Sequence, residues 1–177
     1  MAVWTHIAHD SLSLPAASVT WGVATPISGS YDHLCIKISG RSAYSGYFDS
    51  IQVNFNNDTT AANYSTTQLL ANTATPISQR GAWTAMGYVT ADSALADTFG
   101  NTTVWIPNYA NTANFKQCVI QNAGENASTT DDQWILNFSA LLWADTSAMT
   151  EIDIYLGTAG DDWMANSTFD LYGITGA

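Results

Sequence analysis

The chain has 177 residues, enough for one domain with a substantial core, and 46% of them are apolar, so disorder is not expected. Only 11% of the residues are charged, and four basic against 15 acidic residues give a net charge of −11. Because neutralising phosphates requires clustered Lys or Arg, this composition argues against direct nucleic-acid binding. No apolar run approaches the roughly 18 residues of a membrane span, so we expect no membrane partner.

Short segments that alternate apolar and polar residues recur along the whole chain, between clusters of turn-forming residues. In chain order the expected strands span residues 4–8, 18–23, 34–38, 51–55, 83–89, 103–106, 115–121, 134–143, 152–156 and 169–174. Three of them alternate strictly, and we expect their apolar faces to point into one core: Leu34, Ile36 and Ile38; Ile51, Val53 and Phe55; Ile152, Ile154 and Leu156.

This pattern predicts an all-β fold, namely a single-domain antiparallel β-sandwich that is jelly-roll-like and extends over residues 1–177. Helical patterns are short by comparison. Residues 66–74 and 91–99 are each compatible with a short helical segment, the second with Asp92 as its N-cap. Neither segment is long enough to organise a core, and the abundant Asn, Ser and Thr favour loops.

The first residues and the cysteines bear on the compartment in which the chain folds. Residues 1–6 lack the positively charged region of a secretory signal, so we expect synthesis in a cytoplasm. Cys35 and Cys118 are the only cysteines, and each lies in an apolar, strand-like segment. We expect two buried free thiols, with one disulfide as the alternative, and no zinc site.

The most informative stretch joins a strand to a polar loop in mid-chain. The alternating residues 51–55 end in Asn56-Asn57-Asp58, and Asn63-Tyr64-Ser65 follows; near the other end the chain reads Leu171-Tyr172-Gly173-Ile174. Together these segments resemble a group of small bacteriophage virion proteins with an FNGDxxxNYS-like loop and an LYGI-like C-terminal strand. Asn57 stands where that group has glycine. The resemblance also covers two earlier structural motifs, Tyr31-Asp32-His33-Leu34 and Arg41-Ser42.

The resemblance implies a β-sandwich that decorates or cements the phage head, or that belongs to the tail. It implies synthesis in the host cytoplasm, a place on the outer capsid surface and the major capsid protein as partner. It also makes a homo-oligomer the expectation, with a trimer as the first choice because local threefold positions recur across icosahedral shells. Low charge and many aromatic residues suit lasting protein contacts, although aromatic residues also favour strands as such.

The three histidines are His6, His9 and His33. A spacing of three places His6 and His9 on opposite faces of a regular strand, so a metal site built on this pair requires a turn. We therefore expect the histidines to be surface or interface residues.

Oxygen-rich segments are the other candidates for a metal site. Calcium prefers several oxygen ligands, but Asp131-Asp132, Asp161-Asp162 and the 56–58 loop lack the spacing of an EF-hand, and adjacent aspartates in turns are usually solvated. Glu125 and Glu151 have no context typical of a glycoside hydrolase. Asn-x-Ser/Thr sequons occur, but without a secretory signal glycosylation is not expected; they begin at Asn57, Asn63, Asn101, Asn126, Asn137 and Asn166.

No set of nucleophile, base and orienting group is recognisable, so we expect a protein that is not an enzyme. We assign no catalytic, cofactor-binding or metal-ligating residue. The expected function is that of a phage virion structural protein that decorates or cements the outer capsid surface by bridging capsomers. The alternative is a carbohydrate-binding, lectin-like module on a tail fibre or capsid surface, with sugar-stacking candidates Trp83, Trp105, Tyr109 and Trp163.

Overall fold

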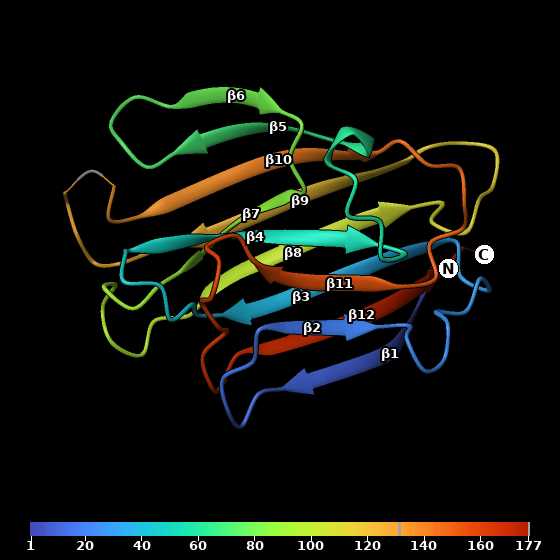
Figure 1. Ribbon diagram of the computed structural model, residues 1–177, viewed down its shortest axis with the longest axis horizontal. Helices are drawn as coiled ribbons and strands as arrows, with labels where there is room; N and C mark the ends of the chain where they lie inside the picture. Colours follow the sequence, from blue (N-terminus) through green and yellow to red (C-terminus); the bar gives the residue numbers. More distant parts are fainter. Residues whose placement is uncertain (131, 177) are drawn as a thin grey trace.

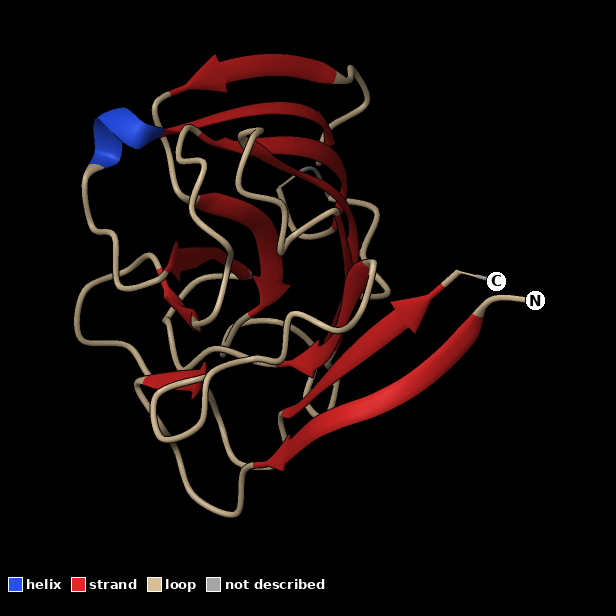
Figure 2. Ribbon diagram, turned by 90° about the vertical axis from the view of Figure 1, so that its right-hand side faces the viewer, coloured by secondary structure: helices blue, strands red, loops and turns tan. Residues whose placement is uncertain are grey.

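The computed structural model describes residues 1–130 and 132–176 and consists of two antiparallel sheets packed face to face (Figure 1). The large sheet has eight strands in the order β1-β12-β3-β8-β9-β10-β5-β6, and the small sheet has four in the order β2-β11-β4-β7. Figure 2 shows the large sheet curving over the small one. The predicted antiparallel β-sandwich is therefore confirmed.

The large sheet is made of β1 (Val3–Ser11), β12 (Thr168–Thr175), β3 (His33–Gly40), β8 (Gly100–Pro107), β9 (Lys116–Gly124), β10 (Ile135–Trp143), β5 (Tyr64–Ala71) and β6 (Ile77–Gly81). The small sheet is made of β2 (Ser18–Trp21), β11 (Ile152–Leu156), β4 (Phe48–Phe55) and β7 (Ala85–Thr90). Helical structure in the described residues is limited to one 3-10 turn, η1 (Ala61–Asn63). None of the helical structure in that part of the chain is long and apolar enough to cross a membrane.

The strands pair in a nested, jelly-roll-like order, and the chain crosses between the sheets at both of its ends. Strand β12 pairs with β1 and β3 in the large sheet, while β11 pairs with β2 and β4 in the small sheet. Strands from the beginning of the chain therefore pair with strands from its end. Further in, β3 pairs with β8 and β4 pairs with β7, which continues the nesting.

The core lies between the two sheets, and the three predicted apolar faces all point into it. Leu34, Ile36, Ile51, Val53, Phe55, Ile152 and Ile154 are fully buried, and Ile38 and Leu156 nearly so. Cys35 and Cys118 are buried and free, which confirms the prediction of two buried thiols. Burial raises the pKa of the Cys118 thiol to about 12, so this thiol stays protonated at neutral pH.

Neither predicted helical segment is helical. Residues 66–74 overlap β5, where alternate side chains are buried and the strand pairs with both β10 and β6. Its neighbour β6 was not expected either, whereas the ten predicted strands are all present. Residues 91–99 form turns instead. The buried Arg41 guanidinium donates hydrogen bonds to the backbone carbonyls of residues 92, 94, 95 and 98. Those carbonyls are consequently not available for a helical ladder.

Candidate interaction surface and histidine cluster

The face of the large sheet that points away from the core carries a line of exposed apolar side chains. Leu69 of β5 lies directly opposite Phe138 of β10, and Val119 of β9 lies directly opposite Trp105 of β8. Val119 is paired with Ala140, two residues along β10 from Phe138, so the two pairs are diagonal neighbours. These side chains are 37–56% exposed.

Trp4 of the edge strand β1 extends this line. Its ring lies 5.3 Å from that of Trp105, edge to face, and 5.8 Å from that of Tyr172. Cys35 lies between Trp105 and Tyr172 in the strand register and is fully buried although it faces outward. The aromatic side chains thus cover it. We call the resulting diagonal set the apolar stripe: Leu69, Phe138, Val119, Trp105 and Trp4.

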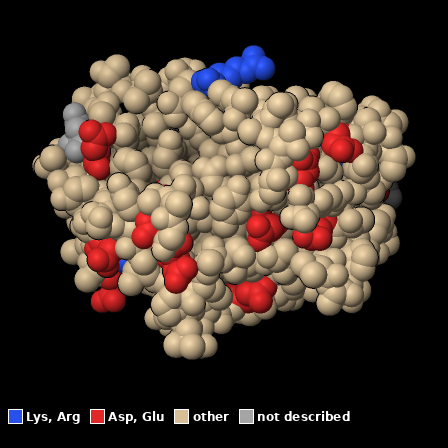
Figure 3. Space-filling model, in the orientation of Figure 1, with Lys and Arg blue, Asp and Glu red and all other residues tan. Residues whose placement is uncertain are grey.

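The charge of this face differs from that of the whole chain. Strands β3, β8, β9, β10, β5 and β6 contain no Asp or Glu. Arg41 and Lys116 are buried, and the exposed basic residues Lys37 and Arg80 both point outward from this face. The face over the small sheet instead carries scattered acidic side chains (Figure 3). These six strands therefore carry no carboxylate in a protein of net charge −11, and the one on the outward side of the neighbouring β12 is Asp170, beside the Trp4 end of the apolar stripe.

A group of polar side chains lies beside the Trp4 end of the stripe, where β1 pairs with β12. The register of this pair shifts between His6 and Ala8, so that Ile7 is an extra residue on β1. This β-bulge arises at two consecutive apolar residues, Ile7 and Ala8, which both pack against the core. Its effect is that His6 and His9 both point outward, which corrects the prediction that they lie on opposite faces.

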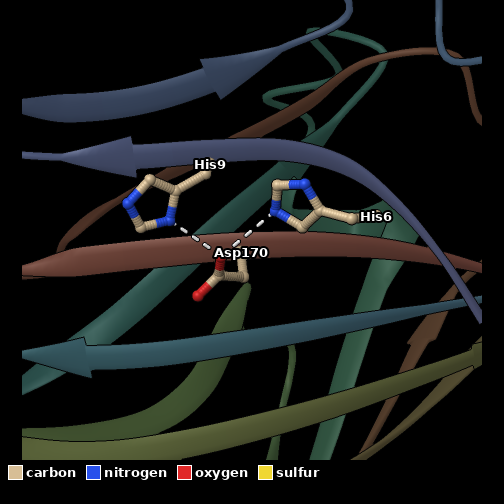
Figure 4. Close-up of side chains that lie close together, drawn as sticks. All are labelled: His6, His9 and Asp170. Atoms are coloured by element: carbon tan, nitrogen blue, oxygen red, sulfur yellow. Dashed lines mark hydrogen bonds and ion pairs between the residues drawn. The ribbon is translucent and has the colours of Figure 1, made fainter.

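His6, His9 and Asp170 form what we call the histidine cluster (Figure 4). The Nε2 atom of His6 lies 3.3 Å from Oδ1 of Asp170, and the Nδ1 atom of His9 lies 2.8 Å from the same oxygen. Both imidazoles are about half exposed, and the Asp170 side chain is 26% exposed. These two contacts are the ion pairs found among the described residues. The His6 ring also lies edge to face with the Tyr172 ring, with 5.3 Å between the ring centres.

The four aromatic residues expected to stack on sugars do not form one site. Tyr109 and Trp163 are fully buried: the Tyr109 hydroxyl donates to the Ser28 carbonyl, and Trp163 packs edge-to-face on Phe169. Trp105 belongs to the apolar stripe. Trp83 is 40% exposed and lines a separate groove between the two sheets.

This groove, which we call the amide groove, has a volume of about 340 Å³. The Gln79 amide donates to Oε1 of Gln68 at 2.8 Å, and Nε2 of Gln68 has no hydrogen-bond partner although the side chain is buried. Its lining is formed by Ser50, Gln52, Gln68, Gln79, Trp83, Ala85 and Tyr88. Several amides and two aromatic rings thus meet in one depression.

The polar loop after β4 serves the fold. Asn56 and Asn57 have φ angles of 51° and 55°, in the left-handed region that glycine and asparagine tolerate best. Glycine and Asn57 are therefore interchangeable in conformation here. The Asn56 amide donates to the Ala148 carbonyl and its Oδ1 accepts from the N–H groups of Thr150 and Glu151, which ties β4 to the segment before β11.

Asp58 is the centre of the same loop. Its carboxylate accepts hydrogen bonds from the Trp143 indole at 2.8 Å and the Asn63 amide at 2.8 Å, and its backbone carbonyl accepts from the Tyr64 hydroxyl. Chiefly because of the bond from Trp143, the pKa of Asp58 is lowered to about 2. Its oxygen atoms are consequently engaged by donors, which leaves this loop poorly suited to calcium. Of the other two oxygen-rich candidates, the Asp131-Asp132 pair includes Asp131, which lies outside the described residues, and Asp161-Asp162 lies in the loop between β11 and β12.

The remaining motifs of the resemblance also have structural roles. A Cβ atom on Gly173 would lie 2.4 Å from the Tyr31 ring, so the ring packs directly on the glycine backbone. Asp32 then accepts from the Gly176 N–H. Arg41 holds the 92–98 turns, and the Ser42 hydroxyl donates to Asp49. Every motif segment thus contributes to a loop or strand contact.

Comparisons with known proteins leave the function to be inferred from these surfaces. No protein-family model and no curated protein matches the chain. An alginate lyase, Aly36B, aligns with 95% of this chain and 79% of its own, at 9% identity and a TM-score of 0.31. The D1-D2-D3 domains of the flagellar cap protein FliD from Escherichia coli align with all of this chain and 55% of their own, at 13% identity and a TM-score of 0.15.

Proposed function

We propose that the chain is a structural protein of a phage particle that decorates or cements the outer capsid surface and has no enzymatic activity. The observation that carries this proposal is the apolar stripe. A contiguous line of exposed apolar side chains on a monomer is typical of a protein contact surface. Aromatic side chains and few charged groups are features of interface cores, and strands β8, β9, β10 and β5, which carry most of the stripe, contain no Asp or Glu.

The charge distribution favours the same face as the contact with the shell. A protein with a net charge of −11 is repelled by other acidic surfaces, and the outer face of the large sheet is where that repulsion is weakest. The resemblance of the 51–65 and 169–174 segments to phage virion proteins makes the major capsid protein the partner that we propose. The loop after β4 then has the role of holding the sandwich together.

The test compares particles assembled with the wild-type chain, with Val119→Asp and with Ser18→Asp. Val119 is 41% exposed in the middle of the stripe, whereas Ser18 is an exposed residue of the small sheet. We expect Val119→Asp to bind particles at least about tenfold more weakly, because a charge is placed in an apolar contact. Ser18→Asp adds the same charge on the opposite side and should bind like the wild type.

The readouts are co-sedimentation with particles and the temperature at which particles release DNA. Particles without the chain, or with Val119→Asp, should release DNA at a lower temperature. Circular dichroism of both variants establishes that they fold. Equal DNA release from particles with and without the chain would refute the cement function, and equal binding of both variants would refute the stripe as the contact.

The amide groove favours a second candidate, a carbohydrate-binding module. Grooves that bind small polar ligands combine apolar walls with a few placed hydrogen-bonding groups. Here Trp83 and Tyr88 supply rings, and Gln68 supplies a buried amide without a partner. For this function, Trp83→Ala should reduce adsorption to host polysaccharide while leaving particle stability unchanged, which is the opposite of the result expected for a cement protein.

A further inference from the structure

The histidine cluster combines three metal-ligating groups that come from two hydrogen-bonded strands. We propose that His6, His9 and Asp170 bind a divalent transition-metal ion of the zinc type. One ligand atom from each residue lies within 4.8 Å of the other two. Two imidazoles and one carboxylate are a ligand set that proteins use for such ions. This site is independent of the proposed structural function, because it is argued from the cluster's own geometry.

The distances are close to those that a bound ion imposes. With ligand bonds of about 2.0–2.1 Å, a tetrahedral zinc site has ligand atoms about 3.3 Å apart. Asp170 Oδ1 already lies 3.3 Å from His6 Nε2 and 2.8 Å from His9 Nδ1 (Figure 4). An ion would lie between the three ligand atoms, which all lie within 4.8 Å of one another, so side-chain rotations that draw the two nitrogens together would complete the site.

The backbone holds the three groups in place. Asp170 lies on β12, which is paired on both sides, with β1 and with β3. Because of the bulge at Ile7, the side chains of His6 and His9 lie on the same face of β1, as those of residues i and i+2 do in a regular strand. Tyr172 packs against the His6 ring. Because the ligands do not depend on a loop, little conformational entropy opposes binding.

The surroundings define the kind of ion. Hard cations such as Mg²⁺ and Ca²⁺ prefer oxygen ligands, whereas imidazole nitrogen suits zinc and its neighbours. Lys37, the cross-strand partner of Asp170 on β3, lies on the same face and makes no ion pair with it in the described residues. Its charge opposes all divalent cations alike, and the preference for a zinc-type ion comes from the two imidazoles. Cys35 and Cys118 are buried and do not compete for the ion.

Three protein ligands leave at least one coordination position open. In zinc sites such a position is taken by water or by a ligand from outside the chain. Because both histidine side chains are about half exposed, the bound ion would be accessible from solvent. The structure thus assigns an exposed, three-ligand metal site next to the Trp4 end of the apolar stripe.

The experiment is calorimetric titration of the tag-free full chain with Zn²⁺, with Mg²⁺ and Ca²⁺ as comparisons. We expect one Zn²⁺ per chain and no detectable binding of the other two ions. His6→Ala, His9→Ala and Asp170→Asn should each weaken Zn²⁺ binding by at least about tenfold. His33→Ala removes the one histidine outside the cluster and should leave the affinity unchanged.

A second measurement guards against variants that lose binding by unfolding. Zn²⁺ that binds the native state raises the melting temperature of the wild type and of His33→Ala. The three cluster variants should melt cooperatively without that rise. Absence of Zn²⁺ binding by the wild type, loss of binding in His33→Ala, or undiminished binding in His6→Ala and His9→Ala would each overturn the assignment.

Discussion

At the scale of single residues, the loop after β4 is held by one carboxylate. Asp58 accepts bonds from the Trp143 indole and the Asn63 amide, and these bonds are strongest when the group is ionised. The pKa of Asp58 is lowered from 3.8 to about 2 in the folded protein. A carboxyl group whose pKa is lower when folded contributes stability that is complete above its unfolded pKa and is lost as the pH falls through its folded value.

We therefore predict a difference in acid stability between the wild type and Asp58→Asn. At pH 7 the variant should be less stable by about 1–2 kcal/mol, because its charge-assisted hydrogen bonds become neutral ones. Between pH 4 and pH 2, the interval set by the two pKa values, the wild type should lose this advantage. Urea unfolding at a series of pH values measures the effect, and a constant difference across the series would contradict it.

The features of single residues that could be predicted from the sequence are those that depend on residues next to them in the chain. The end of a strand at Asn56 was predictable because asparagine and aspartate favour turns. The bonding of Asp58 to Trp143 was not, because 85 residues separate them and only the fold brings them together. The same holds for Asp170, which lies more than 160 residues from both histidines of its cluster.

At the scale of elements, alternation identified ten of the twelve strands. Strand β5 was missed because its core-facing positions include Thr66 and Gln68, which read as polar although both are buried. The histidines of β1 were placed on opposite faces because strict alternation allows no extra residue. The sequence signal of the bulge is the apolar pair Ile7-Ala8 between them, since two consecutive core-facing residues require a bulge in an edge strand.

Strand β9 offers a direct test of alternation. Val119 is 41% exposed on the outer face, and its neighbour Ile120 is fully buried in the core. We predict that Ile120→Asp destabilises the fold by more than about 3 kcal/mol, because it buries an unpaired charge, while Val119→Asp changes stability by about 1 kcal/mol or less. Thermal unfolding of the two variants measures both effects. Equal losses of stability would show that the strand register is wrong.

At the scale of the whole molecule, the predicted features differ in their basis. The sandwich followed from patterning, because a sheet with one buried face must alternate. The contact surface did not, because the stripe is diagonal and takes its members from five strands, of which β1 and β5 are remote in sequence from β8, β9 and β10. The low charge and the many aromatic residues led to the general expectation of protein contacts and did not indicate which face makes them.

Association of the chain with itself is the remaining prediction, with a trimer as the first expectation. Apolar contacts between chains should withstand salt. Raising the salt concentration from about 0.15 M to about 1 M shortens the Debye length from about 8 Å to about 3 Å, which weakens exposed ion pairs and leaves apolar contacts in place. The higher salt concentration also screens the repulsion between chains of net charge −11. Light scattering at high micromolar concentration should give an oligomer whose mass persists in high salt. A monomeric mass under both conditions would contradict it.

The pairing of the first strand with the last has a consequence for how the protein folds. In the described structure β1 pairs with β12 alone, and Val3 lies opposite Thr175. During synthesis, β1 therefore remains without its partner until β12 has been made. Contacts so distant in sequence are slow to form, since a long loop must close before they contribute. We conclude that folding is completed only after translation of β12, and that the edge carrying His6 and His9 is among the last parts of the large sheet to form.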